Sequence, residues 1–194
     1  SMARKKKTVD LDRDNGVAPG IIAKTKKRLV VAGGRSHPEL TAAVAEALGT
    51  EIAPVEHRTF ASGEIYARFE VSIRGVDLFL IQTFGEPVNE WLMETLIMID
   101  AAKRASAKRI TVVAPYYPYS RQDKKGRGRE PISARLVADL LKTAGADRVM
   151  SVDLHAAQIQ GFFDGPVDHL FAKPVLLDYF ERTLSPADRE ILTV

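Results

Sequence analysis

The 194 residues contain no cysteine, few aromatic side chains (7%) and no long apolar run. Without cysteine the chain can form neither a disulfide framework nor a thiolate metal site. Every apolar stretch is shorter than the roughly 18 residues that a membrane-spanning helix needs. No apolar segment follows the basic N-terminus, so we expect no secretory signal. These absences favour a cytoplasmic protein, and a hydrophobic content of 45% suffices for a globular core.

The net charge of +3 conceals two regions of opposite sign. Residues 1–28 hold nine Lys and Arg against three Asp, a balance of +6, which leaves 19 cations against 22 acids, a balance of −3. The basic run at 4–7 predicts a solvated, disordered tail over 1–27, with nucleic-acid or membrane contact as the alternative. The acidic remainder argues against a general nucleic-acid surface.

Strand and helix signals alternate after the tail. This alternation predicts an α/β fold with a mostly parallel central sheet flanked by helices, to which 64–82 adds an antiparallel hairpin turned at Arg74-Gly75. We expect Asn89 and Ser133 to cap two of the helices. The domain is predicted to span 28–184, and 185–194 to begin a second domain with a strand at 191–194. Predicted strands are 28–32, 64–71, 78–81, 109–114 and 148–152, and predicted helices are 38–48, 89–105, 133–144 and 173–184.

The segment after the strand at 109–114 is the most cationic in the predicted domain. From Arg121 to Arg129 it holds five cations and one carboxylate in nine residues, interrupted by two glycines. A cationic, glycine-containing loop at the carboxyl end of a strand is where α/β proteins bind phosphate groups. A second dense motif, Asp153-Leu154-His155, opens the next loop. Together the two motifs predict a nucleotide-phosphate site with a metal ion.

Four segments carry a resemblance to a known family. YSRQDKK at 119–125, DLHAAQIQGFFDGPVDHL at 153–170, FASGE at 60–64 and PVNEWLMETLIMIDAAKRASAKRIT at 87–111 resemble the signatures of ribose-phosphate pyrophosphokinases. The resemblance implies a phosphoribosyltransferase-like fold. It also implies transfer of the diphosphoryl group of ATP to the anomeric hydroxyl of ribose 5-phosphate, giving phosphoribosyl pyrophosphate and AMP. Mg²⁺ is the implied cofactor, and inorganic phosphate the implied activator.

The resemblance assigns residues to ATP and to the metal. ATP would contact Arg121, Gln122 and Asp123, and FASGE would recognise adenine across a subunit interface through Phe60, Ser62, Gly63 and Glu64. Ser62 stands where the family usually has Asn or Asp, but a hydroxyl can still donate and accept hydrogen bonds. The metal would contact His155, with Asp153, Asp164 and Asp168 as further candidates. His37, His57 and His169 have no such context and are predicted to be structural or exposed.

The resemblance also implies regulation and assembly. Phosphate or ADP would bind a regulatory interface through Ser72, Arg74, Gln160 and Asp168, and the subunits would form a homo-oligomer, a hexamer built from dimers. The catalytic flexible loop and the ribose-phosphate loop are expected after Val194. A second interpretation is a catalytically silent member of the family, but silent members lose the Arg-Gln-Asp pattern that this chain keeps. A third, a nucleic-acid-binding domain, depends only on the basic tail.

Overall fold

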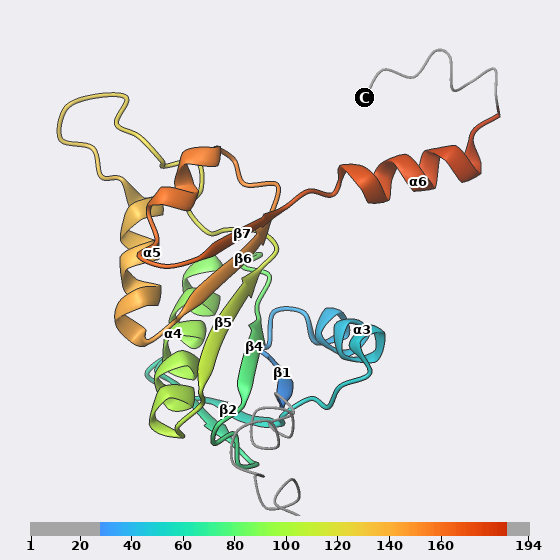
Figure 1. Ribbon diagram of the computed structural model, residues 1–194. Coiled ribbons are helices and arrows are strands. Elements are labelled where there is room, and N and C mark those ends of the chain that lie inside the picture. Colours follow the sequence, from blue (N-terminus) through green and yellow to red (C-terminus); the bar gives the residue numbers. More distant parts are fainter. Residues whose placement is uncertain (1–27, 186–194) are drawn as a thin grey trace, which may run out of the picture.

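Five parallel strands form the central sheet, in the order β1-β4-β5-β6-β7 (Figure 1). The computed structural model describes residues 28–185, so the predicted tail and the predicted strand at 191–194 lie outside the described residues. The strands span Leu29–Gly33 (β1), Asp77–Ile81 (β4), Arg109–Ala114 (β5), Arg148–Val152 (β6) and Val167–Leu170 (β7). The predicted parallel sheet is confirmed. Because all five strands run the same way, the loops that follow them meet at one edge.

Helices cover both faces of the sheet. The first face packs against α4 (Val88–Arg104) and α5 (Ser133–Ala144), and the second against α3 (Pro38–Leu48) (Figure 1). The larger core, between the sheet and α4 and α5, contains the fully buried side chains of Leu78, Leu80, Met98, Ile99, Val112 and Leu141. Gly49 ends α3 in the left-handed conformation (φ 60°), as its position after the apolar pattern predicted.

The antiparallel hairpin exists, but its predicted location was wrong. It consists of β2 (Val55–Thr59) and β3 (Ile65–Phe69), whereas β4 belongs to the parallel sheet. The turn at Gly75 (φ 70°) is real and leads from the hairpin into the sheet. β2 escaped prediction because its sequence, VEHRT, holds only one strongly apolar residue. β3 packs on α4, so the hairpin lies on the helix layer and not beside β4.

Two predicted helix caps were also wrong. Pro87 occupies the N-cap of α4 and Ile132 that of α5, so Asn89 and Ser133 lie within the first turns. Their side chains are used elsewhere. Asn89 accepts a hydrogen bond from the Tyr119 hydroxyl, and the Ser133 hydroxyl donates to Oε1 of Gln122 at 2.5 Å. Residues expected to stabilise their own helices therefore hold the loop that follows β5.

The last described helix, α6 (Lys173–Thr183), extends away from the sheet (Figure 1) and buries none of its residues. The helix predicted at 173–184 is thus confirmed. A short 3₁₀ helix, η1 (Ala157–Gly161), and β7 were not predicted, because both are short and half polar. No helix within residues 28–185 is long and apolar enough to cross a membrane.

Candidate functional site

The loops after β4, β5 and β6 contain strained backbone at the edge where a ligand is expected. Phe84 (φ 55°), Tyr119 (φ 59°) and Asp153 (φ 45°) adopt left-handed conformations although none is glycine. Such conformations cost about 1–3 kcal/mol each and concentrate at functional sites. The carboxyl edge of the central strands is therefore the candidate site on backbone grounds as well as on sequence.

Three tyrosines lie in the loop after β5, and they differ in burial. The Tyr117 side chain is buried, and its hydroxyl donates to the Ala134 carbonyl oxygen at 3.0 Å. Burial raises the pKa of Tyr117 well above its usual range, so it stays neutral. Tyr119 is tied to Asn89 of α4, while Tyr116 is exposed. The buried Tyr117 therefore fixes the loop to α5, and Tyr116 and Tyr119 line a cleft.

This cleft, which we call the β5 cleft, has a volume of about 490 Å³. That volume is within the range of small-molecule sites. One wall is the first turn of α4, whose free backbone N–H groups and positive end of the helix dipole favour an anion. The other wall contains the predicted ATP ligands Arg121 and Gln122. The lining residues are Pro87, Val88, Asn89, Tyr116, Tyr119, Arg121 and Gln122.

Arg121 and Gln122 differ in how firmly they are held. The Gln122 N–H donates to the Tyr119 carbonyl at 2.9 Å, and its own carbonyl accepts from Ala134 N at 3.1 Å. Arg121 is exposed, and none of its side-chain atoms is hydrogen-bonded or ion-paired within residues 28–185. Its planar guanidinium is free to bind two oxygens of a phosphate or to stack on a base.

Asp123, the third predicted ATP ligand, points into the protein. It is buried (7% exposed), and its Oδ2 accepts a hydrogen bond of 2.5 Å from Nε2 of Gln158. Gln158 lies on η1, in the loop after β6. The carboxylate therefore joins the two sequence motifs into one surface. Gln158 lies within the motif at 153–170, but nothing local marks it as the partner of a residue 35 positions away.

The predicted metal ligands do not gather at one point. His155 and Asp164 are exposed. Asp153 accepts from the Ala172 N–H at 3.3 Å, and Asp168 forms an ion pair of 2.7 Å with Arg148. No three acidic, histidine or cysteine side chains in the described part of the chain are placed to hold a metal ion together. Of the four candidates, the side chains of His155 and Asp164 have no protein partner among the described residues.

Two of the other histidines have the structural roles predicted for them. His37 Nδ1 accepts from the Leu40 N–H at 3.2 Å and so caps α3. His169 Nε2 accepts from the Leu154 N–H at 2.9 Å, which fixes the backbone beside His155. His57 is half-buried, with its Nε2 at 3.5 Å from the sulfur of Met98.

The predicted adenine segment forms the exposed turn of the β2–β3 hairpin. The Phe60 N–H donates to the Glu64 carbonyl at 2.9 Å, and Gly63 adopts a φ of 87° that suits glycine. The Ser62 hydroxyl donates to Oε2 of Glu64 at 2.7 Å. Phe60 is 52% exposed, which is unusual for a phenylalanine. None of these residues lines the β5 cleft.

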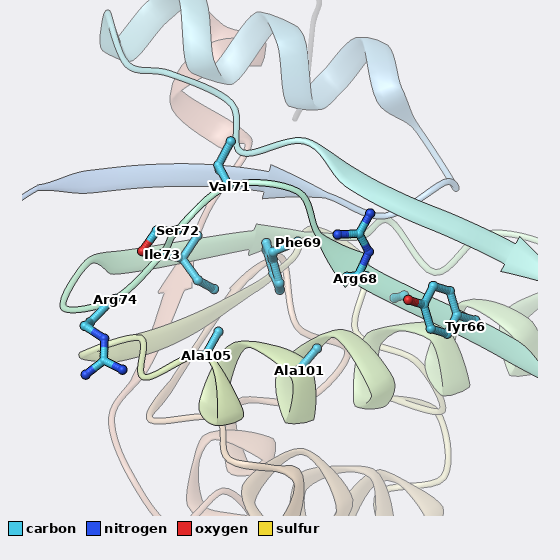
Figure 2. Close-up of a pocket in the computed structure, with 10 residues that line it drawn as sticks. Tyr66, Arg68, Phe69, Val71, Ser72, Ile73, Arg74, Ala101 and Ala105 are labelled. Carbon is cyan, nitrogen blue, oxygen red and sulfur yellow. The ribbon is translucent and has the colours of Figure 1, made fainter.

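The predicted regulatory residues lie apart within one chain. Ser72 and Arg74 line a pocket between β3 and the last turns of α4, and Figure 2 shows Arg74 and Arg68 on opposite sides of Phe69. Gln160 lies on η1, where its Nε2 donates to the Ala157 carbonyl at 3.1 Å. Asp168 lies on β7. Of the four predicted regulatory residues, the structure therefore places only Ser72 and Arg74 in the same pocket.

Comparison with known proteins gives a consistent family likeness. A sequence model of the N-terminal domain of ribose phosphate pyrophosphokinase matches residues 29–145. The chain is 65% identical to a ribose-phosphate pyrophosphokinase of Corynebacterium efficiens over 155 residues, which is 80% of this chain and 48% of that protein. It is 59% identical to one of Streptomyces avermitilis over 175 residues, 90% of this chain and 53% of that protein.

A solved structure agrees with these relatives. The phosphoribosylpyrophosphate synthetase of Mycobacterium smegmatis superposes with a TM-score of 0.79 at 61% identity, covering 81% of this chain and 53% of that one. The chain thus spans about half the length of the relatives that it matches.

Proposed function

Because the chain belongs to the ribose-phosphate pyrophosphokinase family, we propose that the full-length protein transfers the diphosphoryl group of ATP to ribose 5-phosphate. The chain would supply the ATP part of the site. The observation that carries this assignment is the Asp123–Gln158 hydrogen bond, which joins the Arg121 loop and the His155 loop into one surface. The products would be phosphoribosyl pyrophosphate and AMP.

The proposed reaction needs positioning and charge stabilisation more than covalent catalysis. The anomeric hydroxyl oxygen of ribose 5-phosphate attacks the β-phosphorus of ATP and loses its proton, and the bond from the β-phosphorus to the α-phosphate oxygen breaks. Arg121, whose guanidinium has no partner in the described part of the chain, would bind ATP oxygens or stack on adenine. The N-terminus of α4 adds fixed positive potential from across the β5 cleft.

Mg²⁺ fits this site only together with substrate oxygens and water. It prefers oxygen ligands, keeps several waters and is commonly shared with phosphate groups, so it does not need a cage of protein side chains. His155 would be its protein contact, with Asp164 as a second candidate. When bound with ATP, the ion neutralises phosphate charge. The bonds of Asp153 and Asp168 to Ala172 and Arg148 make those two carboxylates weaker candidates.

The turn at Phe60–Glu64 would complete the ATP site of a neighbouring subunit. Its polar groups bond to one another, its phenylalanine is exposed, and it does not line the β5 cleft of its own chain. This role for the turn supports our proposal that the protein is a homo-oligomer, a hexamer. Mixing Phe60→Ala subunits with Arg121→Ala subunits should restore part of the activity, because some mixed sites then contain both native residues. No restoration in a verified mixed oligomer would contradict the shared site.

Inorganic phosphate would bind at Ser72 and Arg74 as an activator, with Gln160 and Asp168 reaching the same interface from another subunit. The support is chemical, since the exposed Arg74 and Ser72 line one pocket (Figure 2). We place the enzyme in the cytoplasm, in keeping with the absence of cysteine from these 194 residues.

The activity is tested with the full-length protein, ATP, Mg²⁺ and ribose 5-phosphate, by separating the nucleotide products. AMP should form only when both ribose 5-phosphate and Mg²⁺ are present. AMP formation without ribose 5-phosphate would indicate hydrolysis. No turnover by a folded protein that still binds ATP would favour the catalytically silent interpretation.

A further inference from the structure

A fully buried carboxylate lies between the β2–β3 hairpin and the sheet. Glu94, on the second turn of α4, has 0% of its side chain exposed. Its Oε1 accepts from the Arg35 backbone N–H at 2.8 Å and from Gln82 Nε2 at 3.1 Å, and its Oε2 accepts from Arg35 Nε at 2.6 Å. A buried charge is tolerated only with such partners, because desolvation is costly. We call Arg35, His57, Gln82 and Glu94 the Glu94 cluster.

The Glu94 cluster connects four elements that are distant in sequence. Arg35 lies in the loop after β1, Gln82 directly follows β4, and His57 is on β2. The first two are linked again through Ser36, whose hydroxyl donates to Gln82 Oε1 at 2.5 Å and accepts from the Thr83 N–H at 3.0 Å. One carboxylate of α4 thus fixes the ends of two neighbouring strands.

On one side the cluster reaches the first turns of α4. The Arg35 guanidinium lies 5.9 Å from the ring centre of Trp91 and 3.8 Å from the Glu90 carboxylate. Gln82 Nε2 is 3.4 Å from the Trp91 carbonyl oxygen. These residues directly follow Pro87–Asn89, which line the β5 cleft. A displacement of Glu94 would therefore move one wall of that cleft.

On the other side the cluster reaches the hairpin. His57 Nε2 lies 3.9 Å from Oε1 of Glu94 and 3.5 Å from the sulfur of Met98, one turn further along α4. His57 is three residues before Phe60, on the strand that leads into the exposed turn. The Glu94 carboxylate therefore lies against His57 of the hairpin. Its partners Arg35 and Gln82 contact the turn of α4 that follows the cleft wall.

We propose that Glu94 is a positioning residue for ATP, which sets the hairpin turn Phe60–Glu64 and the α4 wall of the β5 cleft relative to each other without contacting the nucleotide. This inference rests on the proposed function, since it assigns both surfaces to ATP. It gives each subunit a link between its own ATP cleft and the turn that it offers to a neighbour.

The charge of Glu94 matters as well as its volume. Its two oxygens accept three hydrogen bonds, so glutamine must place its NH₂ group against at least one donor. Glu94→Gln therefore keeps the packing but loses the Arg35 Nε bond or the pair of bonds at Oε1. Arg35→Met removes the counter-charge and leaves His57 as the nearest titratable cation to Glu94.

Steady-state kinetics of the full-length enzyme test the proposal. Glu94→Gln and Arg35→Met should each raise the KM for ATP about tenfold or more, with the KM for ribose 5-phosphate within about twofold, since a lost charged hydrogen bond has that scale. Leu141→Ala, on the buried face of α5, is the control for general destabilisation. It should lower Tm without changing the ratio of the two KM values. Equal rises in both KM values, or a Glu94→Gln enzyme that behaves like the control, would overturn the proposal.

A titration of the His57 ring by NMR follows the cluster without activity. Burial lowers the pKa of His57, Glu94 opposes this, and Arg35 adds to it. Among the described residues these are the charged groups that act on the ring. The pKa should therefore fall further in Glu94→Gln and rise in Arg35→Met. An unchanged His57 pKa in both variants would contradict the electrostatic link between His57 and the rest of the Glu94 cluster.

Amide hydrogen exchange separates this proposal from the proposed function. Glu94→Gln should increase exchange across the hairpin (55–69) and the start of α4, while α5 stays protected. If the wild-type enzyme forms no AMP, the proposed function fails, but this measurement still reports the coupling. If the wild type is active and exchange in the hairpin is unchanged, only the coupling fails. Arg35→Lys, at a partly exposed position, gives an intermediate test should Glu94→Gln fail to fold.

Discussion

Arg121 combines two properties at the scale of single residues: a guanidinium and no protein partner within residues 28–185. We expect Arg121→Ala to lower kcat/KM for ATP by roughly 10- to 150-fold, since hydrogen bonds to charged groups contribute about 1.5–3 kcal/mol. Arg121→Lys should recover part of the loss, because the charge returns without the planar fork. Arg104→Ala, at an exposed ion pair on the far end of α4, is the matched control. If Arg121→Ala and Arg104→Ala have equal kcat/KM values for ATP, Arg121 does not belong to the ATP site.

We expect His57 to make the stability of the fold depend on pH. Burial is the main cause that lowers its pKa below the usual 6.5, so the unfolded chain takes up the proton first as the pH falls. The stability contributed by neutral His57 is therefore fully present above about pH 6.5 and is lost as the pH falls toward the folded-state pKa. Urea unfolding at pH 7.5 and pH 5.5 should show a smaller pH effect in His57→Asn than in wild type. An equal pH effect in both proteins would exclude His57 as its source.

At the scale of elements, the Asp123–Gln158 hydrogen bond is the contact that unites the two loops. Removing Gln158 should cost about 1.5–3 kcal/mol of unfolding free energy, because it leaves the buried Asp123 carboxylate unpaired. Removing Asp123 should cost less, because the exposed Gln158 amide can then bind water. The double variant Asp123→Ala/Gln158→Ala should lose less than the sum of the two single losses. Denaturant unfolding of all four proteins measures the coupling. Strict additivity would mean that the two side chains do not interact in solution.

The sequence was sufficient for those elements whose signal is local. The strands at 109–114 and 148–152 and the helices at 38–48 and 133–144 have the predicted bounds, because apolar periodicity and the glycine ends are read directly from the chain. The hairpin partner β2 and the caps at Asn89 and Ser133 were mispredicted, because tertiary contacts decide them. The Glu94 cluster could not be predicted from the sequence for the same reason, since Arg35, Gln82 and Glu94 meet only after folding. The predicted roles of Arg121, His155 and Ser62 stay predictions.

At the scale of the whole molecule, regulation by phosphate would depend on Arg74. Arg74→Ala should raise the half-activating phosphate concentration at least tenfold, about 1.4 kcal/mol, with little effect on the KM for ATP. Arg68→Ala is the control in the same pocket, because Glu56 already holds the Arg68 guanidinium at 3.0 and 2.8 Å. Initial rates over a series of phosphate concentrations provide the measurement. An unchanged activation curve in Arg74→Ala would place the activator elsewhere.

We propose that a diphosphoryl group, and not a single phosphoryl group, is transferred from ATP by the full-length protein. Phosphorus NMR of the full-length enzyme with ATP, Mg²⁺ and ribose 5-phosphate tests it most directly, because it shows which phosphorus is attacked. We predict loss of all three ATP signals, with AMP and a diphosphate ester on the anomeric carbon appearing in equal amounts. Formation of ADP with a monophosphate ester would show attack at the γ-phosphorus and contradict the claim.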